Sequence, residues 1–129
     1  SGGYGGLSDT EFNELCRLVE AEAGGENVDT RVAVCDVILN RVASEKFPNT
    51  IHDVIFAGQQ FSPVSNGRYF SVVVSDSTRK AVQKAIDEPD HSMGALYFMN
   101  PKYSDPSNVD WFYSSLTYLF SYGDVEFFR

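Results

Sequence analysis

The sequence predicts an α+β fold that is mostly helical and carries a small sheet near its C-terminal end. Apolar residues recur at helical spacing along the first part of the chain, with capping residues before the stretches. The segments 95–99 and 124–128, ALYFM and DVEFF, have the composition of strands instead. Because the strand signals come only after the helical ones, the sheet is expected to form a C-terminal lobe.

The first helix is expected over about residues 10–23. Ser8 or Asp9 can cap its start, Glu11 complements the positive end of its dipole, and Gly24-Gly25 stops it. Its inner face is marked by apolar residues at helical spacing: Phe12, Leu15, Cys16 and Val19.

The second helix is expected over residues 28–43, with Asn27 as its cap. Apolar side chains cover so much of its circumference that we expect it to be the central helix. A short helix over residues 51–58 is expected next, followed by irregular chain over residues 59–70 that Pro63 and Asn66-Gly67 interrupt.

The third long helix is expected to run to Asp87 from a cap at Ser75 or Asp76, with Pro89 ending it. The last part of the chain is expected to hold two paired strands, 95–99 and 124–128. An aromatic-rich segment, DWFYSSLTYLFSYG, lies between them.

Length and composition indicate one domain over residues 9–129, with residues 1–8 as a linker or an expression remnant. The net charge of −8 argues against a nucleic-acid partner. No apolar run approaches the ~18 residues of a membrane span, so no membrane insertion is expected. Any targeting segment would lie upstream of this sequence.

The cysteines and histidines suggest no metal or cofactor. The spacing of Cys16 and Cys35 matches no metal or redox motif, and two small buried residues on neighbouring helices are favoured over a disulfide. His52 and His91 are isolated in the sequence, which argues against a zinc site or a nucleophilic triad.

Glu22 stands out because it continues the apolar stripe of the first helix. Glu20, two residues earlier and about 200° round the helix, is expected on the solvent side. Partial burial and the negative end of the helix dipole would both raise the pKa of Glu22, which suits a general acid. The alternative is a boundary glutamate that reaches solvent past the two glycines.

Five ordered blocks resemble the catalytic domain of the SleB/CwlJ cell-wall hydrolases, from about Leu15 to the C-terminus. They are LVEAEAGGE, VAVCDVILNRV, KFPNTIHDVI, QQFSPV and GALYFMNP. The resemblance implies a fold similar to lysozyme and the lytic transglycosylases, in which a helical lobe and a small β lobe flank a groove. It also places the family's catalytic glutamate on Glu22.

The activity that the resemblance implies is cleavage of peptidoglycan glycan strands between N-acetylmuramic acid and N-acetylglucosamine. A lytic transglycosylase reaction giving 1,6-anhydro products is favoured, because it needs one acid/base. A lysozyme-type hydrolase and a catalytically poor glycan-binding accessory domain are the alternatives. The expected partner is the glycan strand, the expected state a monomer, and the expected location extracytoplasmic, in the cell wall or spore cortex.

A second carboxylate, as most glycosidases use, is not evident. Glu26 belongs to the family motif and lies at the groove or orients the loop into the second helix. Asp36 and Asp53 are interpreted as surface or capping groups. Saccharide binding needs amides, hydroxyls and aromatic surfaces, so a further set of groove residues is expected: Gln60, Ser62, Tyr97 and Asn100.

Two positions depart from the family pattern. Gly24 stands where relatives often have Arg. Near the C-terminus, where relatives commonly show Gly-Asn-His-x-Phe, this chain has Gly123, Asp124 and Val125, so Val125 replaces the His. Asn40 and Arg41 are expected to hold the central helix in place by hydrogen bonds or an ion pair. Three consecutive aromatic residues are interpreted as core rather than as a sugar-stacking platform: Trp111, Phe112 and Tyr113.

Overall fold

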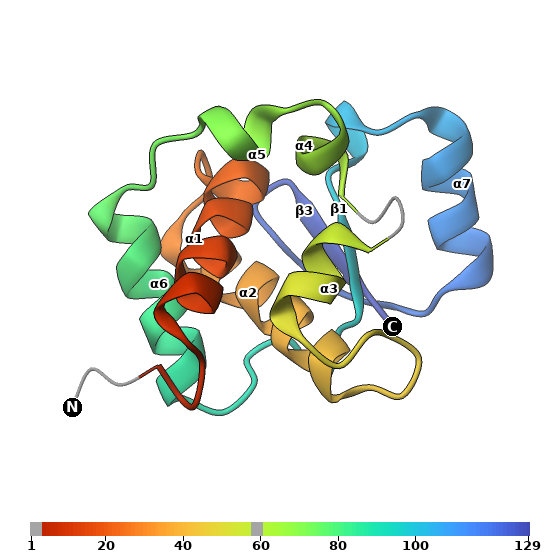
Figure 1. Cartoon of the computed structure of the whole chain (residues 1–129). Coiled ribbons are helices and arrows are strands. Elements are labelled where there is room, and N and C mark those ends of the chain that lie inside the picture. The colour runs from red at the N-terminus through yellow and green to blue at the C-terminus, as the bar shows by residue number, and fades with distance from the viewer. Residues whose placement is uncertain (1–3, 58–60) are drawn as a thin grey trace.

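The structure, a computed structural model, describes residues 4–57 and 61–129. Helices α1, α2, α3 and α6 form one lobe, while the sheet and α7 form a second lobe beside it (Figure 1). The elements in chain order are α1 (Asp9–Ala23), α2 (Val28–Ala43), α3 (Ile51–Phe56), α4 (Ser62–Ser65), α5 (Arg68–Ser71), α6 (Asp76–Asp87), β1 (Tyr97–Met99), η1 (Pro101–Tyr103), α7 (Pro106–Ser115), β2 (Tyr118–Tyr122) and β3 (Val125–Phe128).

The three long helices begin where the capping residues predict. Ser8 and Glu11 form a reciprocal capping box at the start of α1, each side chain accepting from the other's backbone N–H at 3.1 Å. Asn27 Oδ1 accepts from Thr30 N at 2.9 Å before α2, and Ser75 caps α6. Local hydrogen bonding therefore sets these boundaries, as the sequence indicates.

Helix α2 is the central helix, as predicted from its wide apolar surface. Val34, Val37 and Ile38 are completely buried within it. Cys16 of α1 and Cys35 of α2 are both buried free thiols rather than a disulfide. Burial raises the pKa of Cys16 to about 11 and that of Cys35 well above its usual value, so both thiols stay protonated near neutral pH.

The sheet has the strand order β1-β3-β2 with antiparallel pairing throughout. The predicted pairing of the two C-terminal strands is confirmed, with Tyr97 opposite Phe128 and Met99 opposite Glu126. Phe127 joins the main core, whereas Phe128 packs with Met99 under α7. Both faces of β3 are therefore covered, one by the helical lobe and the other by α7.

Two segments contain more regular structure than expected. The stretch expected to be irregular forms α4 and α5, because Pro63 lies in the first turn of α4 and Gly67, at φ 87°, directly precedes α5. Pro63 thus starts α4, and Gly67 separates α4 from α5. The aromatic-rich segment divides into the end of α7 and strand β2, which forms a hairpin with β3.

Asp36 is buried, which corrects its interpretation as a surface group. The chain after α6 folds over α2, leaving Asp36 only 2% exposed, and its Oδ2 accepts from His91 N at 2.8 Å. Burial, with a contribution from the negative charge of Asp90, raises the pKa of Asp36 to about 6. Asp53 is exposed, as expected.

No helix in the described residues is long and apolar enough to span a membrane.

Candidate active site

A groove of about 1730 Å³ separates the helical lobe from the C-terminal lobe. Its volume exceeds the roughly 300–1,000 Å³ of typical small-ligand pockets, which suits an extended ligand. The described segments that line it are the C-terminal end of α1 and the loop after it, Arg41 of α2, the α4–α5 region, β1, the chain from η1 to α7, and the turn between β2 and β3.

Glu22 lines this groove from the last turn of α1, between the buried residues Ala21 and Ala23. Its side chain is partly buried, as its place in the apolar stripe predicts. Burial raises the pKa of Glu22 to about 7, although the nearby positive charges of Arg68 and Arg41 act in the opposite direction. The groove thus contains a carboxyl group whose pKa lies near neutral pH.

The helix end that carries Glu22 is held by two arginines from other elements. α1 has no basic residue in its own last turn. Arg68 donates through Nη2 to Ala21 O at 2.8 Å, and Arg31 donates to Ala23 O at 3.3 Å and Gly24 O at 2.7 Å. These bonds satisfy carbonyls at the helix end and complement the negative end of its dipole.

Glu20 has a different environment, although it is only two residues from Glu22. Its Oε1 accepts from Ser75 N at 3.0 Å, Ser75 Oγ at 3.2 Å and Thr78 Oγ1 at 2.7 Å. Partial burial would raise the pKa of Glu20, but these hydrogen bonds outweigh it and lower the pKa. The expected chemical contrast between the two acids is confirmed, and Glu20 serves to join α1 to α6.

Arg41 lies under the groove and joins the two lobes. Its side chain is 5% exposed, and its Nε donates to Leu96 O at 2.7 Å. The guanidinium lies 4.6 Å from the ring of Phe47, 5.0 Å from that of Phe61 and 5.3 Å from that of Tyr97. The predicted anchoring by hydrogen bonds is confirmed, and Arg41 also lines the groove.

Asn40 likewise anchors α2 to the chain before the sheet. Its Nδ2 donates to Ser92 Oγ and to Ala95 O, both at 3.0 Å. This confirms the expected structural role of Asn40.

The structure brings four of the predicted binding residues to the same groove: Glu26, Ser62, Tyr97 and Asn100. Gln60 lies outside the described residues. Asn100 also has the turn-capping role considered as its alternative, since its Oδ1 accepts from Lys102 N at 3.0 Å. The four come from segments far apart in the sequence, so only the fold makes them neighbours of one cavity.

Three further carboxylates line the groove beside Glu20 and Glu22: Glu26, Asp105 and Asp124. A Cβ on Gly123 would come within 2.6 Å of Glu26 Oε1, so Glu26 reaches the turn between β2 and β3. Asp124 in that turn forms an ion pair with Lys102 at 3.2 Å. Asp105 lies just before α7. The groove is therefore rich in carboxylates, and Glu22 is the one with a strongly raised pKa.

The prediction that Trp111, Phe112 and Tyr113 form core is right only for Phe112. Trp111 is 48% exposed and lines the groove, while Tyr113 is 51% exposed. Consecutive residues of a helix point about 100° apart, so three in a row cannot all face the core. The apolar spacing of Val109, Phe112 and Leu116 in the sequence was the available signal, and these three pack in one cluster.

The two family departures have clear structural settings. A Cβ on Gly24 would lie 2.1 Å from Glu20 Oε2, so a larger residue there requires the Glu20 side chain to shift. Val125, which stands where relatives commonly have His, is buried beside the groove. Its apolar side chain packs into the main core.

Each histidine lies within hydrogen-bond distance of a glutamate. His52 Nδ1 lies 2.8 Å from Glu14 Oε2, and His91 Nε2 lies 2.8 Å from Glu88 Oε1. Across residues 4–57 and 61–129, no group of three His, Cys, Asp or Glu is arranged to hold a metal ion.

The fold and the groove define a two-lobed α+β domain in which a glutamate with a strongly raised pKa, Glu22, lines a large groove between the lobes. The chain belongs to the Cell Wall Hydrolase family, whose model matches residues 25–128. The matched range begins just after Glu22. Membership confirms the resemblance that the sequence blocks indicate.

Curated relatives include spore cortex-lytic enzymes. That of Bacillus subtilis (strain 168) is 39% identical over 97 residues, which are 75% of this chain and 32% of the relative. That of Bacillus cereus (strain ATCC 14579) is 36% identical over 109 residues, covering 84% of this chain and 40% of the relative. The chain thus spans less than half the length of these relatives.

Solved structures confirm the fold. The catalytic domain of the germination-specific lytic transglycosylase SleB from Bacillus anthracis aligns with a TM-score of 0.84 at 32% identity, covering 96% of this chain and 98% of that one. The catalytic domain of the Bacillus cereus SleB protein aligns with a TM-score of 0.81 at 31% identity, covering 96% and 93%. The expected helical lobe with a small sheet is therefore correct.

Proposed function

We propose that this domain cleaves peptidoglycan glycan strands between N-acetylmuramic acid and N-acetylglucosamine, as a lytic transglycosylase with Glu22 as its acid and base. The observation that carries the proposal is the partly buried Glu22 carboxyl in the groove, with a pKa of about 7. Family membership and the solved relative described as a lytic transglycosylase support it. Such a substrate places the action outside the cytoplasm.

The reaction requires one group that first donates and then accepts a proton. Protonated Glu22 gives its proton to the glycosidic oxygen as the bond to C1 of the muramic residue breaks. The resulting carboxylate takes the proton of the muramic C6 hydroxyl, whose oxygen attacks C1 and closes the 1,6-anhydro ring. A pKa near 7 suits both steps, because neither form of Glu22 is strongly disfavoured at neutral pH.

The groove residues are proposed to orient the sugars around that bond. Ser62 and Asn100 offer a hydroxyl and an amide to ring substituents, and Tyr97 offers an aromatic surface. Glu26 and Gln60 belong to the same proposed set, although Gln60 is not among the described residues. Arg68 keeps the peptide backbone beside Glu22 in place.

A lysozyme-type hydrolase is the second candidate, and the observation that favours it is the presence of Glu26 in the same groove. In that reaction a carboxylate would activate water or attack C1 directly, as in most glycoside hydrolases.

Analysis of the products separates these reactions. Purified peptidoglycan would be digested with the protein and the soluble fragments identified by mass spectrometry. Anhydro-muramic ends are expected. Reducing ends, each heavier by one water, would instead support the hydrolase with Glu26 as the next residue to replace, and the release of no fragments would contradict glycan cleavage altogether.

The rate of cleavage is expected to fall as pH rises through about 7, because Glu22 then loses the proton it must donate. Replacing Arg68 by Gln removes a positive charge that lowers the pKa of Glu22. The alkaline limb of the pH–rate profile, where the cleavage rate falls, should therefore move to higher pH. We expect a shift of less than about one pH unit, since Arg68 is exposed and its charge is screened. The measurement is the initial rate of fragment release across roughly pH 5 to 9.

Arg68→Lys is the matched control for this effect. It keeps the positive charge, so its alkaline limb should stay close to that of the unmodified protein. If the rate of the Arg68→Gln protein falls at the same pH as that of the unmodified protein, or at a lower pH, the electrostatic coupling between Arg68 and Glu22 is contradicted.

A further inference from the structure

The wall of the groove formed by the C-terminal lobe presents two aromatic side chains to solvent. Tyr103 of η1 is 86% exposed and Trp111 of α7 is 48% exposed, and both line the groove. Large aromatic side chains dominate burial in cores and interfaces, and two in one cavity wall mark a surface available for contact.

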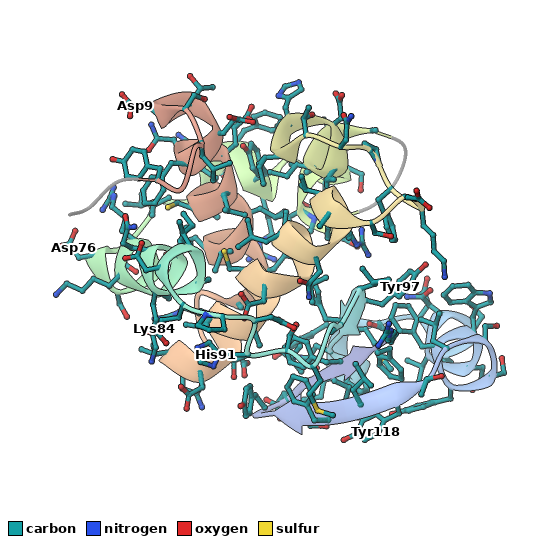
Figure 2. The ribbon with its side chains drawn as sticks, turned by 90° about the horizontal axis from the view of Figure 1, so that it is seen from below. Asp9, Asp76, Lys84, His91, Tyr97 and Tyr118 are labelled. Atoms are coloured by element: carbon teal, nitrogen blue, oxygen red, sulfur yellow. The ribbon has the colours of Figure 1, made fainter. Side chains whose placement is uncertain are left out.

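Trp111 is held in a defined position despite its exposure. Its ring makes edge contacts with Tyr97 at 6.3 Å and with Phe112 at 5.5 Å, measured between centroids. Phe112 is buried and contacts Phe128 of β3 at 5.2 Å. Figure 2 shows Tyr97 on β1 beside α7. The indole is therefore supported from behind, and its remaining surface borders the groove.

Polar side chains accompany these rings along the same wall. Ser104, Asp105, Ser107 and Asn108 all line the groove between Tyr103 and Trp111 in the sequence. The chemistry of this wall is thus aromatic surface next to hydroxyl, carboxylate and amide groups. Sugar rings match it, since they present C–H groups on their faces and hydrogen-bonding groups on their edges.

We propose that Trp111, with Tyr103, forms a glycan subsite on the C-terminal lobe, where a sugar ring of the strand stacks on the indole. α7 lies on the far side of the sheet from α1, so this subsite would hold a sugar away from the Glu22 carboxyl (Figure 1). The subsite rests on the proposed function, because its occupant is part of the strand that is cleaved. Its role is to bind longer strands, with no part in proton transfer.

The single tryptophan of the chain allows a direct test, because all indole fluorescence comes from Trp111. The Glu22→Gln protein, which should bind without turnover, would be titrated with N-acetylglucosamine oligomers of increasing length and with purified glycan strands. Binding would be followed by calorimetry and by tryptophan emission together. We expect an emission change and protection from acrylamide quenching once the oligomer is long enough to reach the C-terminal lobe.

Variants on α7 complete the test in the same Glu22→Gln background. Trp111→Ala should weaken binding of long oligomers roughly tenfold, and Trp111→Phe should restore most of it. Tyr113→Ala is the matched control, because Tyr113 is equally exposed on the same helix but does not line the groove. It should bind like the parent protein, and thermal melts would check that each variant folds.

The outcomes separate the subsite from the proposed function. Calorimetric binding without an emission change, or Trp111→Ala binding as tightly as its parent, would overturn the subsite while glycan cleavage by the unmodified protein still supports the function. No binding to any glycan, together with no cleavage by the unmodified protein, would overturn both.

Discussion

Replacing Glu22 by Gln is expected to lower the rate of glycan-strand cleavage by at least about 10³-fold, within the range that general acid–base catalysis contributes. The amide has nearly the shape of the carboxylic acid but cannot donate a proton to the glycosidic oxygen. Because Glu22 is proposed to act as both acid and base, its loss removes both steps. The measurement is the initial rate at which soluble fragments are released from purified peptidoglycan.

Glu20→Gln is the matched control, since it makes the same chemical change two residues away on the same helix. The Glu20 carboxylate accepts hydrogen bonds from Ser75 and Thr78, which join α1 to α6. Because the amide weakens these bonds, we expect at most about a fivefold loss of cleavage rate. A Glu22→Gln protein that retained more than about a tenth of the parent rate would contradict the assignment of the acid.

Replacing Arg41 by Ala is expected to destabilise the domain by about 3 kcal/mol. The change removes the charged donor to Leu96 O and the cation that contacts Phe47, Phe61 and Tyr97, and it leaves a cavity between the lobes. The measurement is the midpoint of urea unfolding. If the dependence of the unfolding free energy on urea concentration is unchanged, the shift in midpoint reports the change in stability.

Arg41→Met separates packing from charge in that result. The methionine side chain fills most of the volume that the arginine side chain occupied, so Arg41→Met should lose clearly less unfolding free energy than Arg41→Ala. Removing the charge also raises the pKa of Glu22, so the alkaline limb of cleavage should move to higher pH in the folded Met variant. Equal stability of Arg41→Ala and the unmodified protein would contradict a joining role for Arg41.

The family assignment and the position of Glu22 depend on different signals. The ordered sequence blocks indicate the family, and the helical spacing from Leu15 through Val19 places Glu22 on the inner face of α1. The structure agrees with both, and burial supplies the raised pKa. Of the two positive charges that oppose this shift, the larger comes from Arg68, which lies 46 positions further along the chain, and sequence spacing carries no information about such a contact.

The sequence by itself determined the features that depend on neighbours along the chain. The sequence offered Asn27 as the cap of α2, Ser8 or Asp9 as that of α1 and Ser75 or Asp76 as that of α6, and the structure has Ser8, Asn27 and Ser75 in these roles. Apolar periodicity also predicted the central position of α2, and strand composition predicted that β1 and β3 pair, although these strands are far apart in the chain.

Only the tertiary structure decided the features that depend on distant segments. It buries Asp36 beneath the chain after α6, brings Arg31 and Arg68 to the end of α1, and leaves Trp111 facing the groove. The physical reason is that burial and charge are properties of the assembled surroundings. The environment of a side chain depends on the elements that pack against it, and the tertiary structure determines which elements these are.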